Sequence, residues 1–138
     1  MIIKISPDLE KIKSIRKLVN DRIEFVKTVD LEKFSTIIAE NYYEIIKELA
    51  TAILLADGLK STGENTHKDL IDYLLNYGEF NEENVSIIQD LRIKRNKSSY
   101  EGKVISKDYI SFKKKKFDRI IGKLDILLDG KLKQPKTF

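Results

Sequence analysis

The chain has 138 residues, of which 41% are hydrophobic, a size and content typical of one domain with a single core. It has no cysteine, one histidine and no cluster of carboxylates, which excludes disulfide and thiolate chemistry and leads us to expect no metal and no cofactor. A net charge of +4 mildly favours anionic partners, and the lack of a signal peptide or of an apolar run near ~20 residues predicts a cytoplasmic protein without a membrane partner.

The first half of the chain predicts two helices. Ser6 and Pro7 are typical of an N-cap and a first helical position, and apolar residues then recur every three or four positions as far as Val26. Asp30 is expected to cap a second, longer helix that ends before Gly58. The face of this helix that we expect to be buried carries Phe34, Ile38, Tyr42, Ile45, Leu49, Ala52 and Ala56.

Three further helices are predicted in the second half. Thr66 and Asp69 fit a capping box that opens a short helix, and Asn81 fits the cap of a fourth helix that ends at Gly102. The last helix is expected to begin at about Ser106 and to end near Gly130. Strand-like alternation is almost absent. The apolar residues expected on the core side of the last helix are Tyr109, Phe112, Phe117, Ile120, Leu124 and Leu127. The prediction is an all-α domain over 1–138, an up-and-down bundle of four main helices plus a short fifth helix.

The fourth helix has a charge where its apolar stripe should continue. Ile88 and Leu91 belong to the stripe, and the next position of that stripe is Arg95. A guanidinium is costly there unless it is paired or placed at a wet interface, and Asn96 beside it is a weak helix former. Such departures often mark function. The alternative interpretation is that Arg95 pairs with an acid of a neighbouring helix.

The residues around this charge resemble a known motif. Arg92, Arg95, Asn96, Tyr100 and Gly102 are similar in order and spacing to the signature of the HEPN superfamily, in particular of a tyrosine-bearing branch of uncharacterised prokaryotic members. That signature is an arginine, usually a polar residue, and a histidine four to six residues after the arginine. The order of a long second helix, a short third helix, the motif helix and a basic final helix also fits, so the resemblance covers most of the chain.

The resemblance implies a role with RNA. Many HEPN proteins are metal-independent endoribonucleases, in which the ribose 2′-hydroxyl attacks the adjacent phosphate. Arg95 would bind the phosphate, and Asn96 would orient the arginine or the nucleotide. Tyr100 stands where catalytic members have histidine, and a phenol with an ordinary pKa of about 10 is a poor general base. We therefore expect an RNA- or nucleotide-binding protein with weak or no nuclease activity. The alternatives are an active endoribonuclease that uses Arg95 and Tyr100, and a purely structural interaction module.

Helix geometry and the resemblance both imply partners. Arg95 and Tyr100 are ~140° and ~7.5 Å apart on an ideal helix, so one helix does not easily bring both to one phosphate. A twofold homodimer with facing motif helices could do so, and HEPN proteins commonly dimerise in this way. The resemblance also implies a toxin–antitoxin or defence-type system, with a nucleotidyltransferase-type partner protein for which Tyr100 would be the target.

Other charged and aromatic residues have two interpretations. If RNA binds, the expected phosphate contacts are Arg92, Lys94, Lys97, Lys113 and Lys116. Lysines 113–116 equally suit side chains whose stems cover apolar surface. His67 is expected to be a solvated residue in the first turn of the third helix. Of the adjacent tyrosines at 42 and 43, we expect one in the core and the other at a surface or interface. The 35% charged content, with lysine dominant, is typical of a hyperthermophile, although base-poor genomes give similar usage.

Overall fold

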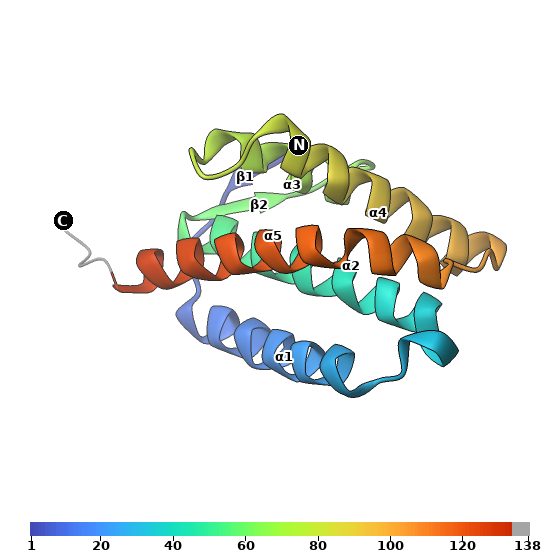
Figure 1. Ribbon diagram of the computed structural model, residues 1–138. Coiled ribbons are helices and arrows are strands. Elements are labelled where there is room, and N and C mark those ends of the chain that lie inside the picture. Colours follow the sequence, from blue (N-terminus) through green and yellow to red (C-terminus); the bar gives the residue numbers. More distant parts are fainter. Residues whose placement is uncertain (134–138) are drawn as a thin grey trace.

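A computed structural model describes residues 1–133, and this part of the chain is mostly helical (Figure 1). In chain order its elements are β1 (Ile2–Lys4), α1 (Leu9–Thr28), α2 (Leu31–Ala56), β2 (Leu59–Ser61), α3 (Thr66–Tyr73), the 3-10 turn η1 (Leu74–Asn76), α4 (Glu82–Glu101) and α5 (Lys107–Lys133). The predicted helical class is confirmed. The two short strands are a departure from the prediction.

Helix α2 passes through the middle of the molecule, with α1 on one side and α3 and α4 on the other, while α5 runs alongside it (Figure 1). Because α2 is covered from several directions, its adjacent residues Tyr42 and Tyr43 are both buried. The expectation that one of them would lie at the surface is therefore wrong. The ring of Tyr42 packs 5.3 Å from that of Phe117 on α5, between centroids.

Most of the apolar residues that were predicted to face the core do so, but Phe34 and Phe112 are exposed. Phe34 is 38% exposed, because its non-helical backbone (φ −127°, ψ 36°) kinks the first turn of α2. Phe112 is 82% exposed. It lies two residues after the buried Ile110, hence about 200° around the helix from it. The buried residues of α5 are Ile110, Phe117, Ile120, Leu124 and Leu128.

The predicted caps of α2 and α4 are confirmed. The Asp30 carboxylate accepts a hydrogen bond from the Glu32 amide. At α4, the Asn81 side chain accepts from the Asn84 amide at 2.9 Å, and the Asn84 side chain accepts from the Asn81 amide in return. These bonds fix where both helices begin, and with them the phase of the buried faces.

The predicted N-caps of α1 and α3 are wrong. Asp8, not Ser6, is the N-cap of α1, and its carboxylate accepts from the Lys11 amide at 3.0 Å. Thr66 is the first residue of α3 rather than its cap, since its hydroxyl donates to the Gly63 carbonyl instead of accepting from the helix. Helix α5 ends at Lys133, a few residues beyond the predicted end near Gly130.

Strands β1 and β2 form an antiparallel pair in which Ile3 lies opposite Lys60. Beyond the pair, the Ile5 amide donates to the Gly58 carbonyl at 2.8 Å. Gly58 has a φ of 71°, and a Cβ added there would lie 2.9 Å from the Ile5 carbonyl oxygen, so both conformation and space require glycine. The pair joins the first residues of the chain to the segment that leads into α3.

Candidate functional site

The residues of the HEPN-like motif line an open hollow between the start of α3 and the second half of α4, which we call the α3–α4 hollow. Arg92, Asn96 and Tyr100 follow one another at steps of four, with Arg95 beside them, so they share one face of α4. The α3 side supplies Glu64, Asn65, Thr66, His67 and Lys68. All three predicted catalytic residues, and Arg92 of the predicted RNA contacts, therefore line the same hollow.

Arg95 forms an ion pair with Glu44 of α2. Its Nη2 donates to Glu44 Oε1 at 3.0 Å, and the side chains are 23% and 15% exposed. The other oxygen of Glu44 lies 2.7 Å from Lys47 Nζ. The guanidinium also lies 5.6 Å from the centre of the Tyr43 ring. The alternative interpretation of Arg95, pairing with an acid of a neighbouring helix, is thus what the structure shows, and this pairing fixes the guanidinium beside the hollow.

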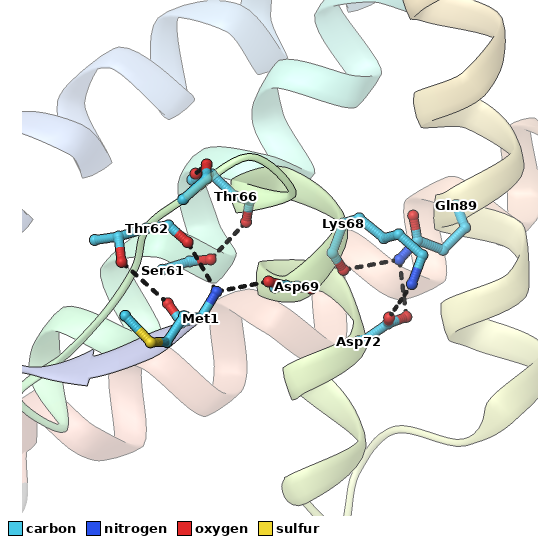
Figure 2. Close-up of polar contacts among 9 residues, drawn as sticks. Met1, Ser61, Thr62, Thr66, Lys68, Asp69, Asp72 and Gln89 are labelled. Atoms are coloured by element: carbon cyan, nitrogen blue, oxygen red, sulfur yellow. Dashed lines mark hydrogen bonds and ion pairs between the residues drawn. The ribbon is translucent and has the colours of Figure 1, made fainter.

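Gln89 on α4 connects Arg92 to α3. Its Nε2 donates to the Lys68 carbonyl at 3.0 Å and to the Asp72 carboxylate at 2.9 Å, as Figure 2 shows. Its Oε1 accepts from Arg92 Nε at 2.6 Å. One amide therefore holds both the backbone of α3 and the side chain of Arg92. The bond to Arg92 uses Nε and leaves the two terminal nitrogens to bind phosphate oxygens.

His67 lies on the α3 side of the hollow, between two anchored residues. The Thr66 carbonyl accepts from the Ser61 hydroxyl at 2.6 Å, and the Lys68 carbonyl accepts from Gln89 (Figure 2). His67 is exposed as a residue, as expected in a solvated first turn, although its neighbours cover part of the side chain. Sequence reasoning missed that His67 lines the same hollow as the motif arginines. This placement depends on how α3 packs on α4 and has no local signal.

The electrostatic surroundings of His67 favour its neutral form. Partial burial lowers its pKa, and the positive charges of Lys47, Arg95 and Arg92 lower it further, against the opposing effect of Glu44. At neutral pH the ring is therefore mainly uncharged and able to accept a proton.

The remaining predicted RNA contacts lie elsewhere. Lys94 and Lys97 line a second hollow at the junction of α4 and α5, together with Lys103. The ammonium of Lys94 lies 4.8 Å from the centre of the Tyr109 ring. Of the two lysines predicted on α5, Lys113 is partly exposed, and Lys116 lies 3.7 Å from a carboxylate oxygen of Glu83. The predicted phosphate contacts are thus distributed over three parts of the surface.

Tyr100 occupies the last turn of α4, just before Gly102 ends the helix in the left-handed region at a φ of 69°. Its side chain is 81% exposed. A residue this open is accessible to RNA or to a second protein.

Among residues 1–133 no group of three or more His, Asp or Glu side chains is arranged to hold a metal ion. None of the helices in this range combines the length and the apolar character needed to cross a membrane. Comparison with known proteins finds no matching family model and no matching curated protein.

Proposed function

We propose that the chain is a HEPN-like cytoplasmic protein that binds the sugar-phosphate backbone of RNA at the α3–α4 hollow and cleaves it slowly or not at all. The observation that carries this proposal is the pair of guanidiniums, Arg92 and Arg95, on one side of an open hollow. Within residues 1–133 no carboxylate lies within ion-pair distance of Arg92. A phosphate is the anion that two guanidiniums at such a surface suit best.

The neighbours of the two arginines support binding of a nucleotide chain. Arg92 is oriented by Gln89 through Nε, and Arg95 is held by Glu44 through one terminal nitrogen. Both arginines are therefore positioned before a ligand arrives, which reduces the entropy lost on binding. Asn96, from the same side of the hollow, offers an amide to a ribose or a base.

The proposal includes an up-and-down arrangement of α1, α2, α4 and α5 with α3 as the short extra helix, and a homodimer. At the end of α4, Tyr100 and Val104 are 81% and 80% exposed, and they offer apolar area to a second copy. The toxin–antitoxin or defence-type role, with a nucleotidyltransferase-type partner acting on Tyr100, is the part of the proposal that rests on the resemblance alone.

Two other functions are each favoured by one observation. Because Tyr100 and Arg95 line the same hollow, an active endoribonuclease that uses both is a second candidate. The intrachain pair of Arg95 with Glu44 favours a structural interaction module. RNA binding that is lost with the arginines would exclude the structural module, and the cleavage experiment described below tests the nuclease.

The test is the anisotropy of a labelled single-stranded RNA of mixed sequence, titrated with protein in EDTA at several salt concentrations. We expect the R92Q/R95Q double variant to bind at least about tenfold more weakly. The slope of log K against log salt concentration should also fall by an amount that corresponds to about two phosphate contacts. The matched control is K13Q/K17Q, which removes two charges from the exposed face of α1. Equal binding by both double variants, with folding verified by circular dichroism, would exclude this hollow. Light scattering on the same samples tests the homodimer.

A further inference from the structure

The α3–α4 hollow brings together groups of two kinds on opposite sides. The α4 side carries the guanidiniums of Arg92 and Arg95, which can bind phosphate oxygens. The α3 side carries His67, the only histidine of the chain. An imidazole is the side chain best suited to accept and release a proton near neutral pH. A phosphate held by the arginines would therefore lie between a cationic side and a side able to take up a proton.

The backbone around His67 is held in register with the arginines. Ser61 and Gln89 donate to the carbonyls of the residues immediately before and after it (Figure 2). The side-chain oxygen of Gln89 also accepts from Arg92. The Gln89 side chain thus sets the spacing between the α3 backbone next to the imidazole and the guanidinium of Arg92. Fixed spacing between a proton acceptor and a phosphate-binding group is what general base catalysis requires.

The charges around His67 come from every element that packs near it. Helix α2 contributes Lys47 and Glu44, and α4 contributes Arg92 and Arg95. On α3 itself Lys68 is paired with Asp72 at 3.0 Å, and the carboxylate of Glu64, just before α3, lines the same hollow. His67 also lines a second, mainly apolar cavity, to which Lys11, Lys47 and Lys60 contribute positive charge. Cations outnumber anions in this set. Partial burial and this excess of positive charge lower the pKa of His67, so the ring is mainly unprotonated at neutral pH.

We infer that His67, and not Tyr100, is the catalytic base for RNA cleavage at the α3–α4 hollow, an inference that rests on the proposed function. The neutral imidazole accepts the proton of a ribose 2′-hydroxyl. The O2′–P bond forms and the P–O5′ bond breaks, while the arginines stabilise the charge on the non-bridging oxygens. The leaving 5′-oxygen takes a proton from water, and the imidazolium returns its proton to the solvent. The products are a 2′,3′-cyclic phosphate and a 5′-hydroxyl.

The experiment follows cleavage of the labelled mixed-sequence RNA in EDTA by the full chain as a function of pH. We expect slow cleavage whose rate rises with pH and levels off below the ordinary imidazole pKa of about 6.5. In H67Q the rate should fall at least about 100-fold and lose this pH dependence. RNA affinity should stay within about twofold of wild type, because neutral imidazole and an amide carry the same charge. K17Q on α1 serves as the control with unchanged rate.

Four outcomes would overturn the inference. Wild-type protein that binds RNA without cleaving it would contradict the inference and leave the proposed function intact. Cleavage by H67Q at the wild-type rate would remove His67 from the chemistry. Loss of cleavage in Y100F but not in H67Q would assign the proton to Tyr100. Cleavage of an RNA analogue with 2′-deoxyriboses throughout would exclude attack by the 2′-hydroxyl. A wild-type protein that does not bind RNA contradicts the proposed function itself.

Discussion

The carboxylate of Glu44 on α2 lies between two cations, accepting from Arg95 Nη2 at 3.0 Å and lying 2.7 Å from Lys47 Nζ. Both oxygens of this carboxylate are therefore used. The pair spans 51 residues of sequence and joins α2 to α4 at the border of the α3–α4 hollow.

E44Q should lower the free energy of unfolding by about 2 kcal/mol. It leaves two partly buried cations without their carboxylate, a loss that would be larger if the side chains were fully enclosed. Urea unfolding followed by circular dichroism measures the change. The matched control is D21N, which breaks the exposed pair with Lys17 on α1 and should cost less than about 0.5 kcal/mol. Equal losses in the two variants would mean that the Glu44 pair contributes no more than a surface pair.

The same E44Q variant should bind RNA more tightly, by about three- to tenfold at low salt. Removing a negative charge beside Arg95 strengthens attraction to phosphate and leaves the guanidinium without a competing carboxylate. RNA anisotropy measures this change, and high salt should reduce it. A variant that is less stable and also binds more weakly would show that Glu44 acts only by positioning Arg95.

Q89L should loosen α3 from α4. The substitution keeps the side-chain volume but removes the hydrogen bonds to Lys68, Asp72 and Arg92, so we expect a loss of about 1–2 kcal/mol. Hydrogen exchange of the α3 amides should speed up more than that of the α2 amides. N20A on the exposed surface of α1 is the control. Unchanged exchange in α3 would show that apolar packing alone holds this helix.

Four tyrosines should make the fold sensitive to alkali. Burial raises the pKa values of Tyr42, Tyr43, Tyr77 and Tyr109, to about 12 for Tyr43, and nearby carboxylates add to the effect at the other three. Their stabilisation is complete below the unfolded pKa of about 10 and is lost as pH rises towards the folded values, because the unfolded chain ionises first. Each tyrosine then contributes a slope of up to about 1.4 kcal/mol per pH unit. Urea unfolding at several pH values above about 9 measures the summed slope.

Y43F separates this effect from packing. The Tyr43 hydroxyl is buried and has no hydrogen-bond partner among residues 1–133, so its removal should leave the stability at neutral pH unchanged or slightly higher. The alkaline slope should become shallower by the contribution of one tyrosine. A large loss of stability at neutral pH would instead show that the hydroxyl is hydrogen-bonded to water in solution.

The sequence predicts the parts of this fold that depend on local chemistry. Asp30 and Asn81 were identifiable as caps because short polar side chains satisfy helix amides from that position. The stripe through Ile88 and Leu91 likewise required only its own spacing. The strand pair could not be predicted, since three residues are too few to show alternation, and its partners come from distant parts of the chain.

The candidate site was predictable on one side only. Arg95 stands out because it interrupts an apolar stripe, Asn96 because it is a weak helix former beside it, and Tyr100 because it follows them at a motif spacing. His67 interrupts no pattern, so nothing near it in sequence indicates that it faces α4. The burial of Tyr43 depends in the same way on how many neighbours surround α2, which spacing within one helix cannot show.

The pairing of Arg95 with Glu44 also has a consequence for ligand size. A ligand with a single phosphate must compete with a carboxylate that is covalently part of the protein and therefore present at high effective concentration. A polymer presents several phosphates at once, so that contacts made at Arg92 or at Lys68 raise the local concentration of the phosphate that reaches Arg95. On the proposed function, the hollow would thus discriminate against mononucleotides and inorganic phosphate in favour of chains, through the valency of the ligand and without reading any base.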